Sequence, residues 1–472
     1  MANKEDITLM AHLMRRAGFG ANREELEARV AKGYEATVEE LLHPEEQPPV
    51  DEYDLLRYHI YLFKPRTGNP PVGGPGVANW MYYLINTKAP LQEKLALFWH
   101  QIFATGVAKV NNYDEITNMI RMFRDKGMGD YKEIVLEVAK NPAMIYWLDN
   151  NENHATAVNE NWGRELLELF SMGVGNYTES DVFEVSRAFT GWTIAPTLPN
   201  FPYGRYDWHF EYRADDHDDG EKTFLGHTGP FNGEDIVDII CEQPATAKFI
   251  CRHLYNFFVA DEVQVPSWSV TPPKDPEAIE TLMKAFQESK RDIRSVLRVL
   301  FNSHFFKEAR FSKIKSPAEV VVGMVRMMGG TEFPYAGFTD LSRQPAILGQ
   351  DLLDPPSVEG WHTGPEWVNS GTLMKRVNFC SDLVGDLTRP GMKDIIARVK
   401  AQGILSPEEL VDTCLDLIGP LEVTSNSRQE LVSHAQKNDI LSWDTTKASE
   451  SSEKKVVGLL QLIVALREYQ YA

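Results

Sequence analysis

Apolar side chains recur along most of the chain at steps of three and four residues, which is the spacing of an α-helix that buries one face. The clearest case is the segment 90–103, where Leu91, Leu95, Phe98 and Ile102 follow this spacing. Further aromatic residues widen its apolar stripe, so this segment predicts a helix that is buried on most sides.

Helix-start signals support the same interpretation elsewhere. Asn22 stands where an N-cap is expected, with Glu25 three residues later, and Pro317 follows Ser316 at a first-turn position. Predicted helices cover 7–16, 22–31, 37–42, 80–86, 90–103, 114–124, 131–148, 159–168, 233–242, 244–259, 276–289, 293–301, 316–328 and 370–387, and three more short helices lie in the tail.

The segment from Ile194 to Gly229 has a different texture, because prolines, glycines and aromatic residues cluster there with little helical period. We predict a long irregular insertion with short hairpins at 208–212 and 222–225. Long ordered loops of this kind often carry function. The fold class is therefore mainly α: a multi-helix globular fold with a long irregular, aromatic-rich insertion and a short β-hairpin.

These differences in residue pattern divide the chain into four parts, which we expect to form one continuous globular unit. They are an N-terminal helical part at 1–194, the irregular aromatic and acidic insertion at 195–230, a second helical part at 231–444, and a polar connector with a C-terminal helix at 445–472. The polar stretch from Thr445 to Lys455 is the candidate for a disordered connector.

Charge narrows the classes of partner. The 472 residues include 48 basic and 68 acidic side chains, for a formal net charge of −20. An acidic chain has no basic face to replace phosphate counterions, so a nucleic-acid partner is disfavoured. No apolar run reaches the ~18–20 residues of a transmembrane helix. The sequence also lacks the glycine fingerprints of a nucleotide cofactor site.

The four cysteines lie far apart and without metal-ligand spacing, so we expect buried free thiols. The N-terminal residues are polar and lack the apolar core of a signal peptide. The sequence as written therefore predicts a cytoplasmic protein, or an exported or periplasmic one if a leader precedes it.

A dense polar stretch after Leu148 has the ligand spacing of a calcium loop. With Asp149 as position one, oxygen-bearing side chains follow at positions three and five, Asn151 and Asn153, and Glu160 stands at position twelve. Hard oxygen ligands of this kind suit calcium.

Two positions depart from the calcium-loop pattern. His154 replaces the glycine of the sharp turn, and Ala157 lacks a side-chain oxygen at position nine. The alternative is an Asn-rich turn that begins a helix, with Asx turns in place of a cation.

The helix after this loop has a polar face, because Glu160, Arg164 and Glu165 lie at helical steps that continue to Glu168. Such a row is usually a solvated, salt-bridged surface. It can instead line an internal metal or acid–base site.

Two histidines are further candidates. His100 lies in the apolar helix 90–103, where a satisfied core histidine and a ligand are the alternatives. His217 and Asp218 belong to an acidic, Gly-terminated turn that is either solvated or a divalent-metal site.

Several segments resemble a bacterial family that is catalogued as domain of unknown function 1800. The matching segments run in order along nearly the whole chain: 13–20 (LMRRAGFG), 98–104 (FWHQIFA), 159–170 (NENWGRELLELF), 177–192, 217–226, 316–319 (SPAE) and 355–361 (PPSVEGW). Family members tend to have a second histidine where Gln101 stands, which puts a two-histidine site in doubt here. The resemblance implies no activity. Members often occur beside sulfatase-like proteins, which implies such a partner and work on an envelope polymer.

We therefore hypothesise a metal-dependent enzyme with hydrolase-type chemistry on an envelope polymer or conjugate. The catalytic residues would be Arg164, Glu165 and His100. Glu160, His217 and Asp218 would hold a divalent ion, calcium or a transition metal, that activates water. Arg164 would stabilise a developing oxyanion.

The rival hypothesis is a non-catalytic glycan- or protein-binding protein in which the Asp149 loop holds a structural calcium. Aromatic rings suit sugar rings and partner surfaces alike. Four aromatic residues would then grip the unknown small molecule or polymer: Tyr206, Trp208, Trp361 and Trp367.

Overall fold

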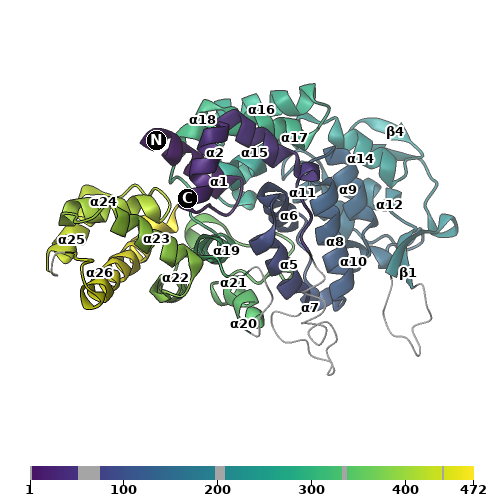
Figure 1. The fold of residues 1–472 in the computed structure, drawn as a ribbon. Coiled ribbons are helices and arrows are strands. Elements are labelled where there is room, and N and C mark those ends of the chain that lie inside the picture. The colour runs from purple at the N-terminus through teal and green to yellow at the C-terminus, as the bar shows by residue number, and fades with distance from the viewer. Residues whose placement is uncertain (1–2, 52–74, 197–207, 332–336, 438–440) are drawn as a thin grey trace. The chain divides into compact units, whose positions relative to one another are not determined.

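The structure is a computed structural model that describes residues 3–51, 75–196, 208–331, 337–437 and 441–472 (Figure 1). Helices dominate these residues, and the named strands form two antiparallel sheets of two strands each. The predicted mainly α fold is thus confirmed. The chain divides into two compact units: unit 1 comprises residues 1–91, 304–351 and 363–472, and unit 2 comprises 92–303 and 352–362. The domain boundaries proposed from the sequence stay predictions.

Unit 1 is built of helices, many of which begin with the caps that their sequences provide. Its elements are α1 (Lys4–Arg16), α2 (Arg23–Lys32), α3 (Tyr34–Leu42), η1 (Pro44–Glu46), α5 (Pro75–Asn86), α18 (His304–Glu308), α19 (Pro317–Met328), α20 (Phe338–Ser342), α21 (Gln344–Ile347), η5 (Gly364–Trp367), α22 (Ser370–Gly385), α23 (Pro390–Ala401), α24 (Pro407–Leu417), α25 (Ser425–Gln436), α26 (Thr446–Ala465) and η6 (Glu468–Gln470). Asn22 accepts a hydrogen bond from the Glu25 amide at 2.9 Å, and Ser316 forms a capping box with Glu319, so both predicted helix starts are confirmed.

Helix α19 lies at the centre of unit 1 and packs against α5, α21, α22 and α23. Nearly all of its residues are buried, because its sequence is apolar on every side. Glu319 and Arg326 are the charged residues of α19, and Arg326 bonds to the end of α5. Its guanidinium donates to the carbonyl oxygens of Ile85 at 2.8 Å and Thr87 at 3.1 Å, and so satisfies acceptors at the end of α5.

Unit 2 contains α6 (Pro90–Ile102) from Gln92 onward. It also contains the elements that carry most of the predicted site residues. They are α7 (Val107–Val110), α8 (Tyr113–Lys126), α9 (Tyr131–Lys140), α10 (Pro142–Trp147), η2 (Asn150–Glu152), α11 (Asn161–Glu168), α12 (Glu179–Ala188), β1 (Trp192–Pro196), β2 (Trp208–Tyr212), η3 (Ala214–Asp216), β3 (Lys222–Phe224), β4 (His227–Gly229), α14 (Gly233–Cys241), α15 (Pro244–Phe258), η4 (Val265–Ser269), α16 (Pro276–Glu288) and α17 (Ile293–Asn302).

The core of unit 2 is aromatic. Trp99 of α6 stacks on Phe103 at 5.7 Å between ring centroids, and Phe103 also contacts Phe170 at 5.3 Å. The Trp99 indole N–H donates to the Gly127 carbonyl at 2.9 Å, and the Tyr131 hydroxyl donates to the Phe170 carbonyl at 2.5 Å. The polar ends of these large rings are therefore satisfied inside the core. The bond from Tyr131 holds the segment just after α11 in place.

The strands confirm the expectation of short β-structure and correct its pairing. Segment 208–212 does not fold back on itself. It is β2, which pairs with β1 in the register Trp192↔Tyr212. The second predicted hairpin is present as β3 and β4, and its turn residues Leu225 and Gly226 have φ of 48° and 83°. Two successive residues with positive φ match the right-handed twist of the paired strands.

Two predictions of secondary structure were wrong. The expected helix 131–148 is two helices, because Asn141 caps a new start through the amides of Ala143 and Met144, and Pro142 takes its first position. The predicted connector from Thr445 to Lys455 is the first half of α26, which buries Ser452 and Val456.

All four cysteines are buried free thiols, as expected. Among the residues that the structure describes, no helix is both long enough and apolar enough to cross a membrane.

Candidate functional site

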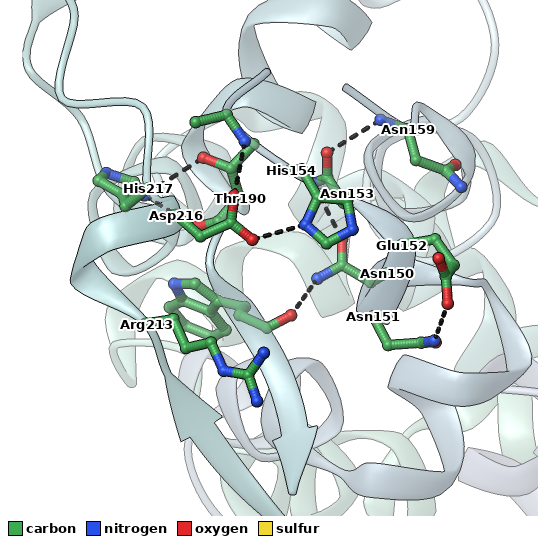
Figure 2. Close-up of polar contacts among 12 residues, drawn as sticks. Asn150, Asn151, Glu152, Asn153, His154, Asn159, Thr190, Arg213, Asp216 and His217 are labelled. Atoms are coloured by element: carbon green, nitrogen blue, oxygen red, sulfur yellow. Dashed lines mark hydrogen bonds and ion pairs between the residues drawn. The ribbon is translucent and has the colours of Figure 1, made fainter. Parts of the chain in front are cut away.

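The Asn-rich loop before α11 uses most of its polar side chains to hold unit 2 together (Figure 2). The Asn150 amide donates to the Trp192 carbonyl at 2.8 Å, and the Asn153 amide donates to the Ser186 carbonyl at 2.9 Å. The Asn153 side-chain oxygen accepts a hydrogen bond from the backbone N–H of Asn159 at 2.9 Å. These bonds tie the loop to α12 and to the start of β1, and one of them closes the loop on itself, as an Asn-rich turn would.

The predicted calcium ligands are engaged in other ways. Asp149 pairs with Lys109, whose Nζ lies 2.8 Å from both carboxylate oxygens, and Glu160 pairs with Arg164 at 3.1 Å. The Asn151 side-chain oxygen is buried without a hydrogen-bond partner, so it is a remaining oxygen donor of this set. Calcium at this loop stays a prediction.

His154 contributes a further polar contact of the loop. Its Nδ1 lies 2.5 Å from an oxygen of Asp216, and Figure 2 shows the two side chains facing each other. The hydrogen bond to His154 is the main cause that lowers the pKa of Asp216. Both side chains are partly exposed, so this pair fastens the loop to η3 at the surface.

The acidic turn after η3 is a structural connection. His217 is nearly buried and its Nδ1 bonds to the Thr190 carbonyl at 2.9 Å. Asp218 accepts two hydrogen bonds from the Arg187 guanidinium, at 2.7 and 3.1 Å, which lowers the pKa of its carboxyl. His217 thus bonds to Thr190, two residues after the end of α12, and Asp218 bonds to Arg187 within α12.

Apart from the Asn151 oxygen, the predicted metal ligands are therefore held by cations and by the main chain. In the described parts of the chain, no group of three or more His, Cys, Asp and Glu side chains is arranged to hold a metal ion.

The α11 helix carries the polar face that the sequence predicted. Arg164 lies between two carboxylates: it donates to Glu179 at 2.7 and 3.0 Å and to Glu160 at 3.1 Å. These bonds raise the pKa of Arg164, with the bond to Glu179 as the main cause. The outer part of this face is the ordinary salt-bridged surface that was the alternative interpretation.

Glu165 has a different environment. It is half-buried, and burial raises the pKa of its carboxyl from 4.5 to about 7, with further contributions from the negative charges of Glu168 and Glu359. Arg164 opposes this rise without cancelling it. A carboxyl group with such a pKa exchanges its proton near neutral pH, which is the property of a general acid or base.

A pocket of about 250 Å³ begins one helical turn from Glu165. Glu168 lines it together with residues of the segment after α11, of α15 and of η4, which include Asn176, Lys248, Phe249, Arg252 and Trp268. The Tyr177 hydroxyl donates to Glu168 at 3.3 Å, so the carboxylate at the pocket is held in place. The pocket thus combines acidic, basic and aromatic side chains.

Trp268 forms one wall of this pocket and is fixed from behind. Its indole N–H donates to the Val263 carbonyl at 2.8 Å, and its ring lies 4.5 Å from the guanidinium of Arg252. Arg252 in turn forms a buried ion pair with Glu262 at 2.7 Å. His253 packs against the same ring at 4.5 Å, and burial lowers its pKa to about 3.

Sequence reasoning missed Trp268 and its supports. The available signal was an arginine inside the apolar segment 244–259, followed by a tryptophan in a Pro- and Ser-rich loop.

His100 is fully buried in α6, where its ring meets Trp361 edge-on at 5.3 Å. Burial lowers the pKa of His100 to about 3, so the ring is neutral near pH 7. The loop 352–362 lies directly against α6, because a Cβ on Gly360 would stand 2.2 Å from the Gln101 carbonyl oxygen. His100 therefore supports this loop from within the core, and a catalytic role for it stays a prediction.

The aromatic residues proposed to grip a glycan do not form an exposed platform. Trp361 and Trp367 are only 4% and 6% exposed, because each packs into the core of its own unit. Trp208 is half-buried against Tyr146 at 5.2 Å. Tyr206 lies outside the described residues.

The comparisons with known proteins agree with the resemblance seen in the sequence. The model of a family described as "Protein of unknown function (DUF1800)" matches residues 12–471, which is nearly the whole chain. The chain belongs to this family. The searches of curated proteins and of solved structures found no match.

Proposed function

We propose that unit 2 binds a saccharide, as part of an envelope polymer or conjugate, and hydrolyses it by acid–base catalysis at Glu165. The observation that carries this proposal is the raised pKa of Glu165, about 7, one helical turn from a pocket that Glu168 and Trp268 line. Pairs of carboxyl groups are the usual machinery of glycoside hydrolysis.

In this proposal Glu165 is the proton donor. When protonated it gives its proton to the leaving-group oxygen, and the Glu168 carboxylate accepts a proton from the attacking water. Trp268 offers a flat ring against which a sugar can stack, and the charged and amide groups of Lys248 and Asn176 can bond to hydroxyl groups. The glycosidic carbon–oxygen bond breaks, and the same carbon forms a bond to the oxygen of water. No further reactant is needed.

The experiment is a turnover assay on a panel of envelope polysaccharides, read as new reducing ends. Glu165→Gln should abolish turnover, because glutamine has no proton to give, while saccharide binding persists. Glu160→Gln is the matched control, since Glu160 precedes the same helix and pairs with Arg164. Equal turnover by wild type and Glu165→Gln would exclude this role.

A non-catalytic saccharide-binding protein is the second candidate, favoured by the half-buried Trp268 ring at the pocket. This function predicts saccharide binding that Trp268→Ala weakens, with no turnover of any polymer. The same panel separates the two candidates.

A divalent cation, calcium above all, remains part of the proposal only at the Asp149 loop. Calcium there would raise the melting temperature without changing turnover, because linkage stabilises the state that binds it. Elemental analysis and melting curves with calcium and with chelator test this point.

A further inference from the structure

A second pocket lies in unit 1 and has a different chemistry from the saccharide pocket. Its volume is about 50 Å³, room for on the order of three or four water molecules. Arg15 of α1 and Lys315, just before α19, line it, together with Phe311, Tyr469 and Tyr471. Two basic side chains and one carboxylate, that of Glu319, thus line a small hollow in a chain whose net charge is −20.

Lys315 is held in the pocket by uncharged groups. Its Nζ donates to the Tyr469 carbonyl at 2.7 Å and lies 4.1 Å from the centre of the Tyr469 ring. Burial and the nearby charge of Arg15 lower the pKa of Lys315 to about 7. An ammonium group in this position would gain from an anion that entered the pocket.

Arg15 reaches the pocket from the other side. Its Nη1 donates to the Gly419 carbonyl at 3.1 Å, and its guanidinium lies 4.8 Å from the centre of the Phe311 ring. Burial, followed by the charge of Arg16, lowers the pKa of Arg15 to about 9. The Phe311 ring covers a planar face of the guanidinium and fixes its orientation.

The neighbouring charges are mixed, with cations in excess. Arg376 donates to the Lys315 carbonyl at 2.8 Å and adds a third positive charge. Glu319 also lines the pocket, and its carboxylate accepts a hydrogen bond from the Ser316 amide at 2.6 Å, at its own helix start. Glu422 lies 3.6 Å from Arg310.

We propose that this pocket binds a small oxyanion, a phosphate or carboxylate group, between Lys315 and Arg15. The guanidinium supplies paired donors and the ammonium supplies a point charge, the combination that suits these groups. The pocket admits a group of this size and little more, so a free ion or the end of a small metabolite fits, whereas a folded partner does not. This site is independent of the saccharide pocket in unit 2.

The test is titration of the full chain with inorganic phosphate and, in a separate arm, with acetate, at constant ionic strength with chloride as reference. The pH is held below 7, where Lys315 carries its charge. Binding by phosphorus NMR or calorimetry, together with a rise in melting temperature, is the expected result. A response to phosphate alone or to acetate alone identifies which oxyanion the pocket takes.

Variants assign the site. Lys315→Met should weaken binding by about tenfold or more, and Lys315→Arg should retain much of it, because it keeps the charge. Lys284→Met is the control, since the Lys284 side chain is 74% exposed in unit 2. A melting curve for each variant shows that it is folded. The proposal is overturned if neither oxyanion binds saturably, or if folded Lys315→Met binds as tightly as wild type.

Discussion

Replacing Glu165 with glutamine tests the environment on which the proposed chemistry depends. Glutamine resembles the protonated carboxyl in shape but cannot ionise. Because the folded protein raises the pKa of Glu165 from 4.5 to about 7, folding favours the protonated form. The stability contributed by that proton is fully present below pH 4.5 and is lost as the pH rises through about 7.

The magnitude follows from the same two values. A rise from 4.5 to about 7 corresponds to roughly 3 kcal/mol if it were fully expressed in stability. Glu165 is only half-buried, and solvent screening reduces this to about 1–2 kcal/mol. Glu165→Gln should therefore match wild type near pH 4.5 and exceed it in stability by about 1–2 kcal/mol at pH 8.

The assay measures the free energy of unfolding of wild type and Glu165→Gln by chemical denaturation at a series of pH values. Calorimetry provides a second measurement. Glu280→Gln is the control, because Glu280 is exposed on α16 and should show no such difference. A stability difference between Glu165→Gln and wild type that stays constant from pH 4.5 to pH 8 would show that folding does not raise the pKa of Glu165.

Three further substitutions test the structure around the site. Glu262→Gln removes one partner of a buried ion pair and leaves Arg252 without its carboxylate, so it should cost about 3–5 kcal/mol in unfolding free energy; a cost below about 1 kcal/mol would contradict the burial of the pair. Gly163→Ala places a Cβ 2.2 Å from Ser186 Oγ, so the packing of α11 on α12 must shift, at a cost of about 1–3 kcal/mol in thermal unfolding; an unchanged melting temperature would show that the helices are further apart. Asn153→Ala removes hydrogen bonds to buried partners and should cost about 1–3 kcal/mol, measured against Asn426→Ala on an exposed helix face, where little change is expected.

Helices and their starts could be predicted because those signals are local. Asn22 and Ser316 cap their helices through contacts three residues away, and the 3.6-residue period marks the buried face. The break at Pro142 was missed because the apolar period continues across it, although the residue pair Asn141–Pro142 is itself a start signal.

The polar face of α11 was predicted correctly as a face, but its burial was not readable from the sequence. Arg164 and Glu165 are adjacent, yet one is salt-bridged at the surface and the other lies in a half-buried position. Burial is the main cause of the difference, and a segment far away in the chain adds to it through the charge of Glu359.

The tryptophans illustrate the same limit. Trp361 and Trp367 stand in a loop-like sequence that suggested exposure, but tertiary packing buries both. Trp268 stands in a similar sequence and remains at a pocket, because Arg252 and Val263 hold its ring from behind. A loop sequence alone does not tell which side of an aromatic ring the fold covers.

Turnover of envelope polysaccharides by wild type and by Glu165→Gln is the most direct test of the central claim. Wild type is expected to release new reducing ends from at least one polymer of the panel, and Glu165→Gln is expected to bind this polymer without cleaving it. Cleavage by Glu165→Gln at the wild-type rate would contradict the claim, as would the absence of both binding and cleavage across the panel.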